Sequence, residues 1–243
     1  GAEFNNPVGF EALLRWNRPI RGRDSPAEFV PIAESTGLIK AIGDWVIREA
    51  CRTAATWPEH LTIAVNLSAP QFDKDRIVDV VTSSLAETGL LPGRLELEIT
   101  ESLLIERPDD VLATLMRLKE LGVSIAMDDF GTGYSSLSYL LKFPFDKIKI
   151  DKSFISAIDH DKAACDVLRT IGSLGKTLGI RITAEGVETE EQVTFLRAIA
   201  CDQLQGYFFA KPLDSSGVAT FLLGNAAQRL KTAETNTPSS KAA

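Results

Sequence analysis

The stretch RLELEIT, residues 94–100, alternates apolar and acidic side chains. In a β-strand this pattern places Leu95, Leu97 and Ile99 on one face and Glu96 and Glu98 on the other. A similar alternation recurs in six further runs: VGFEALLRW (8–16), LTIAVNL (61–67), VSIAMDD (123–129), DKIKID (146–151), IRITAE (180–185) and QLQGYFF (203–209). Between the runs, apolar residues recur at spacings of three and four, which is typical of amphipathic helices. Repeated strand–helix units of this kind predict a mainly parallel sheet.

Two architectures contain such units, an open sheet with helices on both faces and a closed (β/α)8 barrel. Helices on both faces would require both faces of each strand to be apolar. Here one face is apolar and the opposite face carries small and charged residues, which favours a barrel with a polar mouth. We therefore predict an α/β fold, a modified TIM (β/α)8 barrel whose first strand is absent, because the chain provides seven strands rather than eight.

The predicted barrel spans residues 8–224. Residues 1–7 are too few to add a strand and are interpreted as a linker remnant. Residues 225–243 are expected to hold the end of a C-terminal helix and a flexible tail, because the last stretch is polar and rich in Thr, Ser and Ala.

The composition excludes several classes of function. The 243 residues include 26 Lys+Arg and 33 Asp+Glu, a net charge of −7, which argues against binding a nucleic-acid polymer. Since the chain has neither a run of about 18 apolar residues nor a signal peptide, we expect a cytoplasmic domain without membrane contact. Three widely separated cysteines and only two histidines provide neither a disulfide framework nor a histidine-based metal or triad site.

Polar residues occupy the inward position at the end of every predicted strand. They are Glu11, Asn66, Glu98, Asp128, Lys149, Glu185 and Gln205, with Asp129 directly after Asp128. Because the carboxyl ends of barrel strands meet at one mouth, these side chains are expected to lie together. Five carboxylates and one lysine give a charge of −5 + 1 = −4, which must be relieved by protons or cations.

The donor atoms of this cluster indicate which cation it would hold. Carboxylate and amide oxygens, without His or Cys, select hard cations such as Mg2+ or Mn2+. Two divalent ions would cancel the charge. Two such ions are also a recurrent device for hydrolysing phosphate esters, so the sequence predicts a phosphoryl-transfer site.

Asp128 and Asp129 are neighbours, and an uninterrupted strand would point them to opposite faces. Gly131 and Gly133 follow at once, which predicts that the strand ends here and that both carboxylates reach the mouth. One Asp bridging two metals while the next binds only one is a natural hypothesis. The segment DFGTGYSS (129–136) is interpreted as a mobile active-site or interface loop.

Lys149 is the one basic side chain in this predicted cluster, and the surrounding carboxylates should keep it charged. As an ammonium it would position a water or stabilise charge on phosphate, and as a base it would need the metals to shift its pKa. A structural ion pair is the alternative role. One layer deeper, a buried salt-bridge layer is predicted from Glu96, Lys147 and Arg181.

Seven motifs in order carry a family resemblance: EALLRW (11–16), VNLSAPQF (65–72), ELEITES (96–102), MDDFGTGYSS (127–136), FDKIKIDKSF (145–154), TAEGVET (183–189) and QGYFFAKP (205–212). Over residues 8–213 the chain closely resembles the EAL-domain cyclic di-GMP phosphodiesterases. The resemblance implies a modified TIM barrel that uses Mg2+ or Mn2+ to open cyclic di-GMP to linear 5′-pGpG in bacterial signalling. A YQPI-type strand, which usually precedes the EAL segment in that family, is absent here.

The resemblance also implies residue roles. The implied metal ligands are Glu11, Asn66, Glu98, Asp128, Asp129 and Glu185, and the implied catalytic residues are Glu11, Lys149, Glu185 and Asp129. Arg15 and Gln205 match substrate-binding positions, and Glu101 and Glu188 match acids that support the 129–136 loop or the site. Members of the family often form homodimers and are often fused to sensory or GGDEF domains.

Two alternatives stay open at this point. Some EAL-like domains bind cyclic di-GMP without hydrolysing it, so a receptor module is the main rival. A lyase that forms a Schiff base with Lys149 is the other, although a neutral lysine is hard to maintain among so many acids. Metal dependence and the formation of pGpG would separate the three functions.

Overall fold

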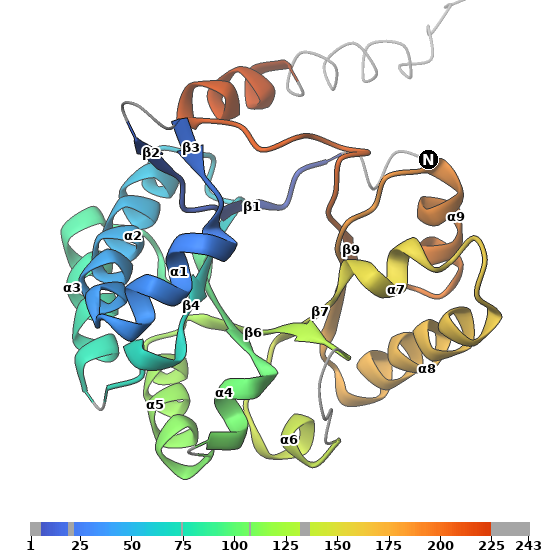
Figure 1. The fold of residues 1–243 in the computed structure, drawn as a ribbon, viewed down its shortest axis with the longest axis horizontal. Coiled ribbons are helices and arrows are strands. Elements are labelled where there is room, and N and C mark those ends of the chain that lie inside the picture. The colour runs from blue at the N-terminus through green and yellow to red at the C-terminus, as the bar shows by residue number, and fades with distance from the viewer. Residues whose placement is uncertain (1–5, 19–21, 74, 107, 132–136, 225–243) are drawn as a thin grey trace, which may run out of the picture.

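Seven parallel strands form one curved sheet in the computed structural model, which describes residues 6–18, 22–73, 75–106, 108–131 and 137–224 (Figure 1). The order of the strands is β1-β4-β5-β6-β7-β8-β9. Their bounds are β1 Gly9–Ala12, β4 Thr62–Leu67, β5 Leu95–Thr100, β6 Ser124–Phe130, β7 Lys147–Ile150, β8 Arg181–Ala184 and β9 Gln203–Leu204. The predicted α/β class and the seven predicted strands are confirmed.

The helices lie outside the ring of strands in Figure 1. The α-helices are α1 Pro26–Ser35, α2 Leu38–Ala55, α3 Arg76–Thr88, α4 Glu101–Glu106, α5 Pro108–Glu120, α6 Leu137–Lys142, α7 Lys152–Ser156, α8 Lys162–Leu178 and α9 Glu190–Ala198. Two 3-10 turns, η2 Ala69–Gln71 and η3 Pro92–Arg94, complete the connections between elements, and residues 215–224 are helical. This arrangement confirms the predicted modified TIM barrel.

The two edge strands of the sheet are β1 and β9. Among the described residues, β1 pairs only with β4 and β9 only with β8, so these two edges share no backbone ladder. Outside this opening, the ring of Phe221 lies 6.1 Å from that of Phe10 on β1. The helical residues 215–224 therefore contact the outer face of the first strand.

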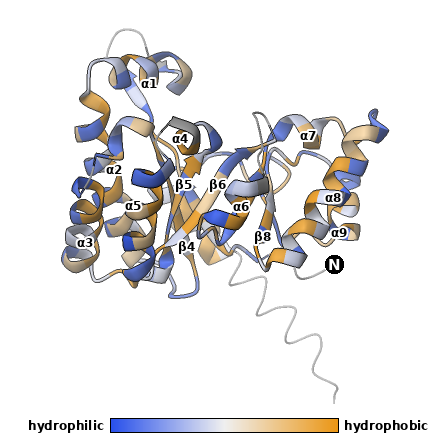
Figure 2. Cartoon of the chain, turned by 90° about the horizontal axis from the view of Figure 1, so that it is seen from below, coloured by the Kyte–Doolittle hydropathy of each residue, from blue (hydrophilic) through white to orange (hydrophobic). Residues whose placement is uncertain are grey.

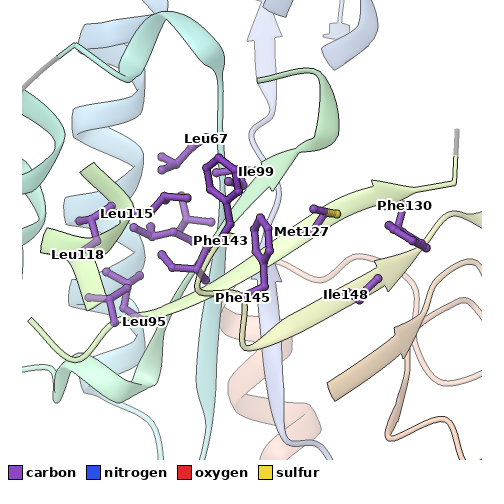
Figure 3. Packing of buried hydrophobic residues seen from close by; sticks show 14 of the residues in the cluster. Leu67, Leu95, Ile99, Leu115, Leu118, Met127, Phe130, Phe143, Phe145 and Ile148 are labelled. Carbon is purple, nitrogen blue, oxygen red and sulfur yellow. The ribbon is translucent and has the colours of Figure 1, made fainter. Parts of the chain in front are cut away.

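The outward faces of the strands form the hydrophobic core. Figure 3 shows Leu67, Ile99, Met127 and Ile148 projecting from neighbouring strands, and all four are buried. Leu115 and Leu118 of α5 cover the same face, and both are fully buried. Figure 2 shows the hydrophobic colouring of the central strands between helices of mixed colour. Because the apolar outward face is buried under the helices, the polar residues of the strands lie on the inward face.

Local sequence fixes several helix ends. Asp161 caps α8, since its Oδ1 accepts hydrogen bonds from the backbone N–H groups of Ala163 and Ala164. Thr189 and Gln192 form a capping box at the start of α9. Gly179 ends α8 with a φ of 69°, in the left-handed region that glycine adopts without strain.

Two predicted strands are too long. The first ends at Ala12 rather than residue 16, and a separate hairpin follows, β2 Trp16–Arg18 paired with β3 Gly22–Asp24. Arg18 forms an ion pair with Asp24, which joins the two strands of the hairpin, and stacks on the Trp16 ring within β2. The last predicted strand, 203–209, ends at Leu204.

Several predictions fall outside the described residues. These include most of the 1–7 remnant, all of the 225–243 tail and positions 132–136 of the Gly-rich loop, so the domain boundaries stay predictions. None of the helices in the described ranges combines the length and apolar character needed to cross a membrane.

Candidate active site

The strand ends bring the predicted polar residues together, as Figure 1 lets the reader follow around the ring of strands. Asn66 on β4 lies opposite Glu98 on β5, and Glu98 lies opposite Ala126 on β6. Lys149 comes from β7, while Glu185 follows the last residue of β8 directly. Register across parallel strands therefore puts residues far apart in sequence at one end of the sheet.

Lys149 lies at the centre of this group. Its Nζ atom is 2.6 Å from Glu185 Oε1, 2.7 Å from Glu98 Oε2, 3.2 Å from Asp128 Oδ1 and 3.8 Å from Glu11 Oε2. Both Lys149 and Glu98 have side chains only 2% exposed. Four carboxylates, three on strands β1, β5 and β6 and one directly after β8, thus converge on one buried ammonium.

Two amide side chains hold Glu11 in place. Asn66 Nδ2 donates to Glu11 Oε1 at 2.6 Å, and Gln205 Nε2 donates to Glu11 Oε2 at 2.6 Å. These bonds link β1 to β4 on one side and to the segment after β9 on the other. Glu11, Asn66 and Gln205 therefore lie together, as predicted. The metal-ligand roles of Glu11 and Asn66 and the substrate-binding role of Gln205 stay predictions.

The Asp128–Asp129 pair lies in an irregular part of β6. The register between β6 and β7 shifts between Met127 and Phe130, and Asp129 has a φ of 54°. A positive φ is uncommon outside glycine and is often found at functional sites. The Asp129 N–H donates to Asp128 Oδ1 at 3.0 Å. The strand continues to Phe130 instead of ending at Asp129 as predicted. Asp128 contacts Lys149, whereas Asp129 beside it is exposed, so the shared site of the two carboxylates stays a prediction.

The pKa values reflect the crowding of charge. Burial raises the pKa of Glu98 well above its usual range and that of Glu185 to about 7, although Lys149 opposes both shifts. Burial also raises the pKa of Asp129, with Asp128 adding to the effect. For Lys149, burial alone would lower the pKa, but the surrounding carboxylates, Glu98 first, outweigh it and raise the pKa. The lysine is therefore held as an ammonium.

The donor set fits hard divalent cations. Four carboxylates lie within 3.8 Å of one ammonium, and two of their oxygens, Glu98 Oε2 and Glu185 Oε1, are buried and contact Lys149 without forming a hydrogen bond of good geometry. In the described part of the chain, however, no three Asp, Glu, His or Cys side chains are already grouped as a metal site, because the ammonium lies between the carboxylates. A metal would therefore require these side chains to move.

The other predicted residues lie around this cluster. Arg15 is partly buried and donates from Nη1 to the Leu14 carbonyl at 2.9 Å. Glu101 is buried at the start of α4, and Glu188 is exposed before α9. Because residues 132–136 lie outside the described ranges, the predicted support of that loop by these two acids is not tested.

The deeper salt-bridge layer is confirmed in part. Lys147 Nζ lies 2.7 Å from Glu96 Oε1, and both side chains are buried. Arg181 was included wrongly, because it is the first residue of β8 and is exposed to solvent. Sequence analysis also missed the β2–β3 hairpin, for which Gly22, with a φ of 79°, was the available turn signal.

Comparison with known proteins identifies the family. Residues 2–212 match the model of the EAL domain. The chain belongs to the EAL-domain family. It is 46% identical over 214 residues to the bifunctional diguanylate cyclase/cyclic di-GMP phosphodiesterase MucR of Pseudomonas aeruginosa, an alignment covering 86% of this chain and 31% of MucR. It is 41% identical over 216 residues to the cyclic di-GMP phosphodiesterase NbdA of the same species, covering 87% of this chain and 28% of NbdA.

Solved EAL domains have the same fold. The PaMucR phosphodiesterase in its c-di-GMP complex superposes with a TM-score of 0.84 at 45% identity, covering 88% of this chain and 89% of that one. The EAL enzyme Bd1971, with cAMP and cyclic di-GMP bound, gives a TM-score of 0.84 at 31% identity, covering 89% of this chain and 60% of that one. This EAL domain spans about a quarter to a third of the length of MucR and NbdA.

Proposed function

We propose that this EAL domain is a metal-dependent phosphodiesterase that hydrolyses cyclic di-GMP to linear 5′-pGpG. The observation that carries the proposal is the convergence of Glu11, Glu98, Asp128 and Glu185 on the Lys149 ammonium at one end of the sheet. The relatedness to MucR and NbdA, which are named as cyclic di-GMP phosphodiesterases, supports the choice of substrate.

The proposed ligands of two Mg2+ or Mn2+ ions are Glu11, Asn66, Glu98, Asp128, Asp129 and Glu185. When bound, the ions supply Lewis acidity at the phosphate ester. Asn66 and Gln205 keep both oxygens of Glu11 oriented toward the site. Because these groups are oriented before the reaction begins, the entropic part of the activation free energy of hydrolysis is lower.

The chain's own residues then have distinct tasks. Lys149, held as an ammonium, places positive charge beside the developing negative charge on phosphate. Glu185 is proposed to act as a catalytic carboxylate as well as a metal ligand. Arg15 and Gln205 are proposed to contact the substrate. A Schiff-base role for Lys149 is disfavoured, because that chemistry needs a neutral amine.

The proposal extends to the setting of the domain. We place the reaction in the cytoplasm, in a homodimer, with sensory or GGDEF domains on the same polypeptide. The last point is supported by the greater length of MucR and NbdA, of which this chain covers 31% and 28%.

The deciding experiment follows conversion of cyclic di-GMP by chromatography with Mg2+ or Mn2+, with EDTA as a control. Binding is measured in parallel. The variant Glu11→Gln should lose turnover, whereas Glu120→Gln, at the exposed end of α5, should leave it unchanged. Binding without metal-dependent pGpG would instead identify a receptor module.

A further inference from the structure

A second buried ion pair lies directly beneath the active-site cluster. Lys147 Nζ and Glu96 Oε1 are 2.7 Å apart, and their side chains are 8% and 5% exposed. They precede Lys149 and Glu98 by two residues on the same strands, β7 and β5. Two parallel lysine–glutamate bridges therefore cross the interior at successive heights, separated by about 6.6 Å of strand.

The intervening strand leaves room for both bridges. β6 lies between β5 and β7, and its Ala126 is opposite Glu98 on one side and Lys147 on the other. Ala126 is fully buried, and Ser124, opposite Glu96, is also small. Larger side chains at these two positions would obstruct the path of the lysine stems across β6.

The two bridges differ in charge balance. The lower pair joins one ammonium to one carboxylate and is neutral. The upper layer has one ammonium, Lys149, facing four carboxylates. Lysine stems are long and flexible, so each ammonium can reach toward carboxylates at either height. A buried charge that loses its partner is strongly destabilising and therefore attracts the nearest opposite charge.

We propose that Glu96 and Lys147 are positioning residues that keep Lys149 in the active-site layer. With Lys147 present, Glu96 is already neutralised and does not draw Lys149 away from Glu98. With Glu96 present, Lys147 does not move up into the acidic cluster. The link to cation binding rests on the proposed function, whereas the placement of the two ammonium groups does not.

Opposite effects on cation affinity follow from the two single substitutions. Glu96→Gln frees Lys147 to approach Glu98, where its ammonium competes with divalent cations, so Mn2+ affinity should fall at least tenfold. Lys147→Met draws Lys149 toward Glu96, which leaves the cluster more negative, so Mn2+ affinity should rise about tenfold while hydrolysis falls. A pair that only stabilised the fold would change the affinity in the same direction in both variants.

The first test is a crystal structure of the metal-free Lys147→Met variant. The expected result is Lys149 Nζ turned toward Glu96; an ammonium still seated between Glu98 and Glu185 would overturn the proposal. This result does not depend on whether the domain is an enzyme.

The second test is Mn2+ titration followed by electron paramagnetic resonance, with thermal unfolding measured in parallel. The neutral variant Glu96→Gln/Lys147→Met keeps the volume of the pair and should bind Mn2+ within about threefold of the wild type. An affinity as low as that of Glu96→Gln alone would overturn the proposal. If Glu98→Gln bound Mn2+ as tightly as the wild type, that result would instead contradict the proposed metal site. The crystal structure would still decide the placement of Lys149.

Discussion

Glu11 and Gln205 are separated by 194 residues in the sequence, yet Gln205 Nε2 donates to Glu11 Oε2 at 2.6 Å. Glu11 lies on β1 and Gln205 directly follows β9, and these two strands share no ladder among the described residues. The hydrogen bond therefore links the two edges of the sheet at the level of the active site. At this level, the ring of strands is closed by a hydrogen bond between two side chains rather than by a backbone ladder.

Loss of this hydrogen bond should reduce activity more than stability. Gln205→Leu frees one oxygen of Glu11, and since a hydrogen bond to a charged group contributes about 1.5–3 kcal/mol, we expect kcat/KM to fall by roughly tenfold or more. Gln205→Glu should cause a larger loss because it adds a like charge beside Glu11. Steady-state kinetics with a thermal unfolding control measures both effects. A smaller fall in kcat/KM for Gln205→Glu than for Gln205→Leu would contradict the role proposed for this contact.

Lys149 should be essential for turnover. Lys149→Met removes the ammonium on which four carboxylates converge, and we expect kcat to fall by about a thousandfold, in line with the loss of a preorganised charge. Lys149→Arg should not restore it, because the planar guanidinium does not replace a compact ammonium. Lys176→Met, on the exposed face of α8, is the matched control. Retention of a tenth of the wild-type rate by Lys149→Met would refute the assigned role.

The sequence located the strands well because burial imposes a regular alternation. Leu95, Leu97 and Ile99 are fully buried on the outward face, as RLELEIT predicted, and Glu98 faces the mouth. The parallel arrangement then places the carboxyl ends together, so the cluster around Lys149 followed from residue order alone.

The features that sequence analysis missed depend on contacts between specific side chains. The β2–β3 hairpin is held by the Arg18–Asp24 pair and by Trp16 packing edge-on to Phe29, and no periodic pattern encodes either contact. The left-handed backbone of Asp129 lies within a register shift between β6 and β7, and such a shift depends on both strands. Arg181 was misplaced because alternation gives the face of a residue but not its distance from solvent at the end of a strand.

The three cysteines should react at very different rates. Cys51 and Cys201 are buried, and burial raises the pKa of their thiols to about 11 and about 12. Cys165 is only partly buried. We expect a single fast-reacting thiol with Ellman's reagent at pH 8 in the native chain and three after denaturation, since the thiolate is the reactive form. Cys165→Ser should remove the fast phase, and a fast phase that survives this substitution would contradict the described packing.

The metal-free domain should lose stability as the pH rises toward neutrality. The pKa of Glu185 is raised by burial from 4.5 to about 7, so the folded chain retains a proton that the unfolded chain releases in this interval. Stability from this group is fully present below pH 4.5 and is lost as the pH rises through 7, by on the order of 3 kcal/mol. Urea unfolding in EDTA between pH 5 and 8 measures the slope. Glu185→Gln should flatten it by about one proton, and an equally steep decline in that variant would show that Glu185 is not the titrating group.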